Sequence, residues 1–334
     1  MSIKFLSTTS AFLLSTSMLV ADVPKVTVDI APVHSLVSKV MNGVGKPDLI
    51  IPAGASPHEY QLKPSNAKSL QDADIVFWIG EDLTPWLEKG LSSLAQDASI
   101  TSLLEVDGVE LLSFREGALF EAHDHDDHDD HGKKKHDDHD DHDDHDDHGK
   151  KKHDDHDDHE GHAHGEHDPH AWLSPQIAKI WLNNIAAKLS EIDPDNAASY
   201  FSNAKSARDN IDTLITEVNS ILDPIRDKKF VVFHDAYQYF EKSFNISASG
   251  AISLGDASDP SPARLSEIRK RVVDEAVECV LAEPQYDPGL VKSVLEGTNA
   301  KTTVIDPLGV SLETGPNLYE NLIRNLATNL AKCF

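Results

Sequence analysis

Short apolar runs alternate with helix-like stretches along the chain, and this alternation restricts the fold more than any other feature of the sequence. From about residue 25 to residue 121, each apolar run has the length of a strand, and the stretches between have helical spacing and polar caps. Strands that alternate with helices form a parallel sheet. The expected strands are KVTVDI, PDLIIPA, DIVFWIG and SITSLLEV, with helices in HSLVSKVMNGV and PSNAKSLQDA.

The same alternation returns in the last third of the chain. Its expected strands are FVVFH, ISASGAIS, CVLAEPQ and KTTVIDP, and SPARLSEIRKRVVDEA and GPNLYENLIRNLATNLAK have helical spacing. Before this series, residues 176–192 predict one helix and residues 194–225 a longer one. The sequence therefore predicts an α/β protein with two lobes of parallel β-sheet flanked by helices and joined by one long bridging helix.

Composition divides the chain at a low-complexity segment rich in His and Asp. Its HDDH units repeat every three residues, which suits neither a helix nor a strand, and Ala163 is the only apolar residue between His123 and His167. Such a segment cannot offset its ordering entropy, so we expect a disordered loop over residues 121–168. The predicted division is a signal peptide over 1–21, an N-terminal lobe over 22–193 that includes this loop, a bridging helix over 194–226, and a C-terminal lobe over 227–334.

Fifteen of the nineteen histidines belong to this segment. Imidazoles among carboxylates bind divalent metals, but a disordered segment must be ordered on binding, which weakens each site. We expect weak sites that capture or sense a divalent metal; the alternative is an acidic, solvated spacer. Its histidines are His123, His125, His128, His131, His136, His139, His142, His145, His148, His153, His156, His159, His162, His164 and His167.

The N-terminus is typical of a signal peptide. Lys4 supplies a positive charge, and the apolar run over residues 11–20 is too short to span a bilayer comfortably. Cleavage is expected after Ala21, and no Cys lies nearby to carry a lipid. These features predict a periplasmic protein; an uncleaved membrane anchor is the alternative.

Charge and cysteine content narrow the function further. A formal net charge of −27 argues against nucleic acid as a partner, because a phosphate backbone would repel the chain, and it favours a cation. Cys279 and Cys333 are the only cysteines, and an even count in an exported protein favours a disulfide. A shared metal or redox role is the alternative, although no CxxC is present.

Three of the four remaining histidines lie at or after the end of an expected strand, or just after the His/Asp-rich segment, where the regular pattern returns. His234 ends FVVFH, His58 follows LIIPA, and His170 lies in DPHAWLSP. Ligands of open α/β sheets bind beyond the carboxyl ends of the strands, where Asp306 also lies. Three imidazoles and one carboxylate suit Zn²⁺, whereas Mn²⁺ would favour more carboxylate.

Each candidate also has an ordinary structural role to consider. A histidine at a strand end is often only hydrogen-bonded, and the context of the other two is what favours ligation. His34 is expected to be a spectator, although it could face the cleft. Asp306 precedes a proline and could cap a turn, and Glu59 is more simply an exposed turn residue than a ligand.

The sequence resembles the ZnuA family, the zinc-binding proteins of bacterial ABC uptake systems, over essentially the whole mature chain. The matching stretches are GASPHEYQLKPS at 54–65, DPHAWLSP at 168–175, FHDAYQYFEKSF at 233–244, CVLAEPQYDPGLV at 279–291 and IDPLG at 305–309.

The resemblance implies three ligands, at His58, His170 and His234. It implies Asp306 as the fourth, since some relatives use an Asp there; others use an acidic residue just before the first histidine, where this chain has Pro57. Glu59 and water remain open. It also implies a Cys279–Cys333 disulfide and a rigid bridge that limits hinge closure.

The expected function follows from the resemblance. The protein would bind Zn²⁺ with high affinity in the periplasm and deliver it to the permease of an ABC transporter, as a monomer and without enzymatic activity. A manganese-specific binding protein is the nearest alternative. A zinc-dependent hydrolase with an open three-histidine site and a surface adhesin or metal-storage protein are more distant ones.

Overall fold

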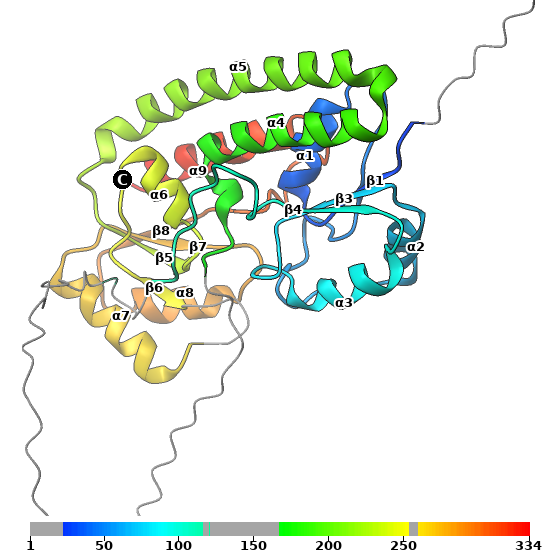
Figure 1. Cartoon of the computed structure of the whole chain (residues 1–334). Helices are drawn as coiled ribbons and strands as arrows, with labels where there is room; N and C mark the ends of the chain where they lie inside the picture. Colours follow the sequence, from blue (N-terminus) through cyan, green and yellow to red (C-terminus); the bar gives the residue numbers. More distant parts are fainter. Residues whose placement is uncertain (1–22, 116–119, 121–166, 254–259) are drawn as a thin grey trace, which may run out of the picture.

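The computed structural model describes residues 23–115, 120, 167–253 and 260–334 (Figure 1). The expected signal peptide and all the segment histidines except His167 lie outside these residues. Within the described residues, no helix combines the length and apolar character needed to cross a bilayer.

The first sheet contains four parallel strands in the order β2-β1-β3-β4. This confirms the parallel sheet that alternation predicted, because each crossover returns the chain in the same direction. The apolar run over residues 75–78 is buried at every position, as a strand covered on both faces must be. The strands are β1 (Val26–Val28), β2 (Asp48–Leu49), β3 (Ile75–Trp78) and β4 (Ser99–Ser102), and the helices are α1 (Ala31–Val40), α2 (Pro64–Asp72) and α3 (Pro85–Leu94).

The second sheet repeats this topology, with four parallel strands in the order β6-β5-β7-β8. In both sheets the first strand of the series lies between the second and the third, so the chain reverses its direction of travel across the sheet beside that strand. Such a reversal leaves a crevice at the carboxyl ends of the strands. The strands are β5 (Phe230–His234), β6 (Ala251–Ser253), β7 (Cys279–Ala282) and β8 (Lys301–Val304), and the helices are α6 (Gln238–Phe244), α7 (Pro262–Asp274), α8 (Pro288–Leu295) and α9 (Leu318–Lys332).

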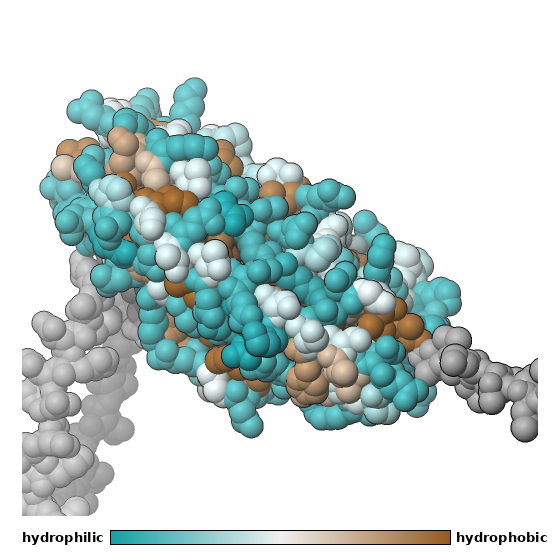
Figure 2. All heavy atoms as spheres, turned by 90° about the horizontal axis from the view of Figure 1, so that it is seen from above, coloured by the Kyte–Doolittle hydropathy of each residue, from teal (hydrophilic) through white to brown (hydrophobic). Residues whose placement is uncertain are grey.

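Two long helices connect the halves of the molecule. After the short helix η1 (Ala171–Leu173), α4 (Pro175–Ile192) and α5 (Ala197–Leu222) form an antiparallel pair, and α5 passes over both sheets (Figure 1). One face of α5 is buried at three- and four-residue intervals, which explains its helical pattern. The surface viewed from the side of α5 is mostly hydrophilic (Figure 2). Short 3-10 turns η2 (Pro194–Asn196) and η3 (Asp223–Ile225) flank α5, so the long helix is shorter at both ends than the predicted 194–226.

The core is continuous between the halves. One hydrophobic cluster extends from the first sheet through α4, α5 and α9 to one face of the second sheet. A smaller cluster fills the other face of the second sheet, beneath α7 and α8. A close-packed core transmits strain rather than bending freely, so this arrangement favours the rigid connection that was expected. The exact lobe boundaries stay a prediction.

The expected disulfide is present. Cys279, the first residue of β7, is bonded to Cys333 at the end of α9, with a Cα–Cα distance of 6.0 Å. It fastens the C-terminus to the strand next to β5. Closing a loop of this length stabilises the folded state by about 4 kcal/mol in the chain-entropy account.

Candidate metal centre

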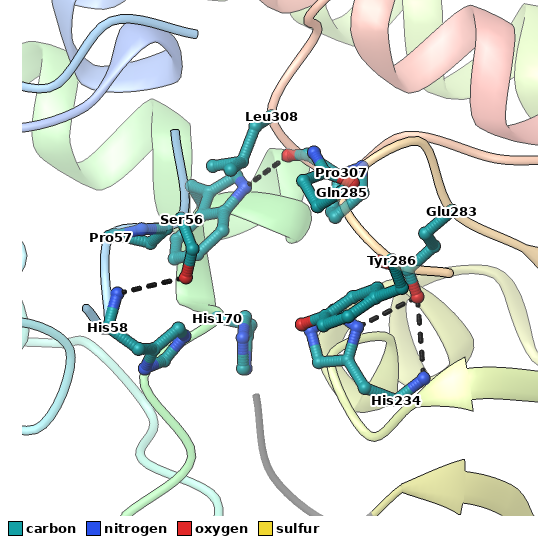
Figure 3. Close-up of a pocket in the computed structure, with 11 residues that line it drawn as sticks. Ser56, Pro57, His58, His170, His234, Glu283, Gln285, Tyr286, Pro307 and Leu308 are labelled. Carbon is teal, nitrogen blue, oxygen red and sulfur yellow. Dashed lines mark hydrogen bonds and ion pairs between the residues drawn. The ribbon is translucent and has the colours of Figure 1, made fainter. Parts of the chain in front are cut away.

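A pocket lies where the carboxyl ends of the second sheet face the loop after β2 and the segment that leads into η1 (Figure 3). Residues from both halves of the chain line it. It contains the three histidines that the sequence singled out, His58, His170 and His234. The lining residues are Ser56, Pro57, His58, His170, Trp172, His234, Glu283, Gln285, Tyr286, Pro307 and Leu308.

Each histidine reaches the pocket from a different element. His234 is the last residue of β5, and His170 immediately precedes η1. His58 lies in the loop between β2 and α2. This loop is held in place by the Trp86 indole of α3, which donates a 2.7 Å hydrogen bond to the carbonyl of Pro57. The site is therefore assembled from segments far apart in the sequence.

The three imidazole rings lie close together, but they are not arranged tightly enough to coordinate one ion. The ring centroids of His58 and His170 are 5.6 Å apart, and those of His170 and His234 are 5.4 Å apart. Among the residues described, no three His, Cys, Asp or Glu side chains are gathered tightly enough to form a ready-made metal-binding group. The rings must therefore draw together if they share an ion.

Two of the rings are oriented by buried carboxylates. Nδ1 of His170 lies 2.7 Å from Asp168 Oδ1, and Nδ1 of His234 lies 2.8 Å from Glu283 Oε1. A carboxylate only accepts, so we assign the proton to Nδ1 in both rings. In that tautomer Nε2 carries no proton, which is the usual state of the coordinating nitrogen in metal-binding histidines.

Sequence reasoning missed both of these carboxylates. Asp168 could have been found from its place two residues before His170 in DPH. Glu283 directly follows β7, so an acidic residue at the carboxyl end of an expected strand was the available signal. Only the pairing of β7 with β5 shows that this signal concerns His234.

The pocket is buried and carries negative charge. His170, His234 and Glu283 are each 4% exposed. Burial, followed by the charges of Glu283 and Asp306, raises the pKa of the Tyr237 hydroxyl. Buried carboxylates without an equal number of cations attract a divalent ion and exclude an anion.

Asp306 occupies a different position from the one expected of a ligand. Its Oδ1 accepts hydrogen bonds of 3.0 Å from the backbone N–H groups of Leu308 and Gly309, and its Oδ2 accepts one of 2.5 Å from Val310. Gln285 Nε2 donates a further bond of 3.3 Å to Oδ1. Asp306 is absent from the pocket lining. In this structure Asp306 caps a tight turn, the alternative considered from the sequence, and its role as a ligand stays a prediction.

The two remaining candidates from the sequence, Glu59 and His34, do not line the pocket. Glu59 is exposed and does not line it. His34 lies 3.1 Å, through Nε2, from the carbonyl of Pro47, and its Nδ1 lies 3.4 Å from the hydroxyl of Ser38. Both ring nitrogens of His34 are therefore engaged within the first half of the molecule.

The predicted disordered loop over 121–168 is wrong for its last two residues, and residues 121–166 lie outside the described residues. His167 pairs with Ser113 in an isolated antiparallel bridge, and Asp168 is 1% exposed. Asp168 folds because its carboxylate has partners at His170 and at Gln238 Nε2, the latter at 3.1 Å. Composition assigned it to the loop, whereas its contacts assign it to the fold.

Comparisons with known proteins agree with one another. A family model described as "Zinc-uptake complex component A periplasmic" matches residues 26–333. The chain is 47% identical over 308 residues to the high-affinity zinc uptake system protein ZnuA of Brucella abortus (strain 2308), covering 92% of this chain and 91% of that protein. It is 44% identical over 314 residues to the protein of the same name from Paracoccus denitrificans (strain Pd 1222), covering 94% and 92%. A solved structure described as "Crystal structure of ZnuA" has a similar fold, with a TM-score of 0.71 at 20% identity, covering 93% of this chain and 99% of that one.

Proposed function

Because this chain belongs to the ZnuA family of periplasmic zinc-uptake components, we propose that it binds Zn²⁺ with high affinity and delivers it to the permease of an ABC transporter. The proposed ligands are His58, His170 and His234. Zinc is the cargo of this site, so the protein must hold the ion tightly and still release it.

The observation that carries the proposal is the convergence of three imidazoles from both halves of the molecule on one pocket. Three nitrogen ligands at about 2.0–2.1 Å from a tetrahedral zinc ion put their ring centroids about 5 Å apart. The His58–His170 and His170–His234 centroid distances of 5.6 Å and 5.4 Å are close to this value, so these two pairs of rings require only a small approach. The carboxylates on two Nδ1 atoms add the orientation that such a site needs.

The fourth coordination position is proposed for Asp306 or water. Asp306 would have to exchange at least one backbone N–H partner for the ion. The variant Asp306→Asn distinguishes the two: a ligand role predicts loss of an anionic oxygen from the zinc X-ray absorption spectrum, and a turn-capping role predicts an unchanged first coordination shell. The same spectrum of the unaltered protein tests Glu59, which would have to turn inward.

The test of the whole proposal is zinc titration of the protein against a chelator of known affinity. We expect one tight site that His170→Ala weakens about a hundredfold or more while the protein remains folded. Retention of that tight site in the variant would contradict the proposal. His34→Ala is the matched control, since it removes a histidine with two partners of its own outside the pocket.

Zinc rather than manganese is the proposed cargo, because three neutral nitrogen ligands suit zinc and manganese prefers oxygen. Competition between Zn²⁺ and Mn²⁺ on a form lacking residues 121–166 tests this at the pocket alone. Preferential binding of Mn²⁺ would replace zinc as the cargo.

The same deletion also tests the accessory segment, which we propose to bind further zinc ions weakly. The number of zinc ions bound per chain should fall while the tight site is kept.

The remaining proposals follow from delivery to a transporter. The protein is proposed to enter the periplasm through a cleaved signal peptide, to remain a monomer, and to catalyse no reaction. Mass spectrometry of the mature N-terminus and sedimentation analysis test the first two. Hydrolysis of an activated ester by the zinc-loaded protein, beyond that of free zinc, would contradict the third.

A further inference from the structure

Residues 110–115, called the strap here, connect the first half of the molecule to the part of the second half next to His234. The strap follows β4 in the chain, yet besides its bridge to His167 it contacts α6, the helix after β5. The backbone N–H of Leu112 donates a 3.0 Å hydrogen bond to the hydroxyl of Tyr239, and Gln238 Nε2 donates one of 3.1 Å to the carbonyl of Ser113. The strap is thus hydrogen-bonded to the helix that follows His234.

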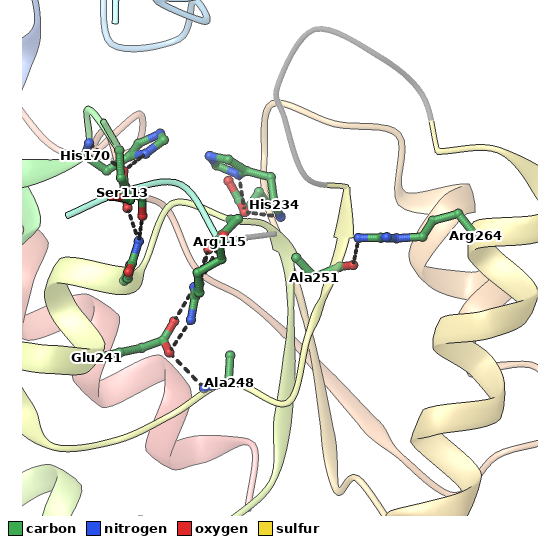
Figure 4. A network of polar contacts seen from close by, with 12 residues as sticks. Ser113, Arg115, His170, His234, Glu241, Ala248, Ala251 and Arg264 are labelled. Atoms are coloured by element: carbon green, nitrogen blue, oxygen red, sulfur yellow. Dashed lines mark hydrogen bonds and ion pairs between the residues drawn. The ribbon is translucent and has the colours of Figure 1, made fainter. Parts of the chain in front are cut away.

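Arg115 makes the most extensive of these contacts (Figure 4). Its Nε donates to the two carboxylate oxygens of Asp235 at 2.9 and 3.0 Å, and its Nη2 also donates to Asp235 Oδ1. Its Nη1 and Nη2 donate to the two oxygens of Glu241 at 2.9 and 3.0 Å. The guanidinium also lies 3.6 Å from the centroid of the Phe120 ring. One planar cation therefore joins two carboxylates in a fixed geometry.

One of the two carboxylates is next to a proposed ligand in the chain, and the other lies in the helix that follows. Asp235 is the residue after His234, and Glu241 lies in α6 and also accepts a 3.0 Å bond from the backbone N–H of Ala248, shortly before β6. The side chains of Asp235 and Glu241 are 4% and 6% exposed, and that of Arg115 is 18% exposed. Buried charges of this kind need a partner, so Arg115 is required where it is.

We propose that Arg115 is a positioning residue that holds His234 within reach of His58 and His170. This inference rests on the proposed zinc site. His234 is the one proposed ligand from the second half, and its distance from the other two depends on how the halves are joined. Arg115 fixes the backbone next to His234 to a segment of the first half. Loosening this contact should therefore let zinc dissociate faster.

The test uses the full chain loaded with one equivalent of zinc and compares the dissociation rate of Arg115→Lys with that of the unaltered protein. Lysine keeps the charge but lacks the planar fork that serves two carboxylates. We expect dissociation about tenfold faster, within the range found when outer-shell partners of metal ligands are changed. The association rate should be unchanged, because the attraction for the cation is the same.

The matched control is Glu110→Gln, on the same strap. Glu110 forms an ion pair with Lys242 in α6, but the two side chains are 69% and 53% exposed. Exposed pairs contribute little, so this variant should release zinc at the unaltered rate. A rate increase equal to that of Arg115→Lys would overturn the special role of Arg115.

A merely structural role predicts a different pattern. In that case Arg115→Lys lowers the melting temperature of the metal-free protein but leaves zinc dissociation at 25 °C unchanged, which overturns the proposal. Should Arg115→Lys not fold, Glu241→Gln removes one half of the contact and must show faster release, or the proposal fails. Failure of the zinc-site proposal has a separate sign. In that case tight zinc binding survives His170→Ala in the otherwise unaltered chain.

Discussion

The two histidine–carboxylate pairs of the metal centre look alike but depend on the fold in different ways. His170 and Asp168 are two residues apart, whereas His234 and Glu283 are separated by 49 residues. The first pair can form within one short segment. The second exists only when β5 and β7 lie side by side. The same chemistry is thus local in one half of the site and tertiary in the other, which makes the second half the more sensitive to structural change.

The largest effect should come from the ligands themselves. His170→Ala and His234→Ala each remove one nitrogen from a proposed three-histidine site, and each should weaken zinc binding about a hundredfold or more, since structural zinc sites derive about 10–16 kcal/mol from four ligands. Chelator competition measures both. A clear difference between the two variants would show that the halves of the site are not equivalent in binding.

The second effect concerns the carboxylate partners. Asp168→Asn and Glu283→Gln should each lower zinc affinity by about tenfold, because a neutral amide replaces the carboxylate: its oxygen accepts more weakly, and its NH2 group no longer restricts the ring to one tautomer. Both variants should also reduce stability, since Asp168 additionally accepts from the backbone N–H of His170 and from Gln238, and Glu283 from the backbone N–H of His234. Affinity and thermal melting, measured on the same samples, separate these effects. Unchanged zinc affinity in both variants would contradict the orienting role.

The third effect comes from removing the disulfide, which lies next to the His234–Glu283 pair and not to the His170–Asp168 pair. Replacing Cys279 and Cys333 by serine should lower the free energy of unfolding by about 4 kcal/mol, as measured by denaturant titration. Because β7 leads directly into Glu283, zinc affinity should fall slightly, by about threefold or less, well below the effect of Glu283→Gln. A tenfold loss would mean that the disulfide positions Glu283 directly.

The smallest effect is expected at His34. His34→Ala should leave zinc affinity unchanged, because both ring nitrogens of His34 face partners away from the pocket. Isothermal titration of the tight site measures this. A loss comparable with that of His170→Ala would place a ligand outside the pocket and would remove the basis of the comparison between the two pairs.

Much of the fold could be predicted because its signals are local. The alternation of apolar runs and helical stretches gave all eight strands of the described chain, and the buried face of α5 repeats at helical spacing. The helices α3, α6 and α8 were expected only from this alternation, without residue ranges of their own. They have only ten, seven and eight residues. Short amphipathic stretches of this kind are hard to separate from loops.

The sequence alone determined the residue types of the proposed site, three histidines each near a strand end or a re-entry point, and the cysteine pair that forms the disulfide. Only the tertiary structure decided which groups serve those histidines. Glu283 reaches His234 through strand order, Asp306 is occupied by a turn, and Arg115 crosses between the halves. The reason is physical: periodicity and residue chemistry act over a few neighbours, whereas the order of parallel strands is set by crossovers of many residues that leave no local pattern.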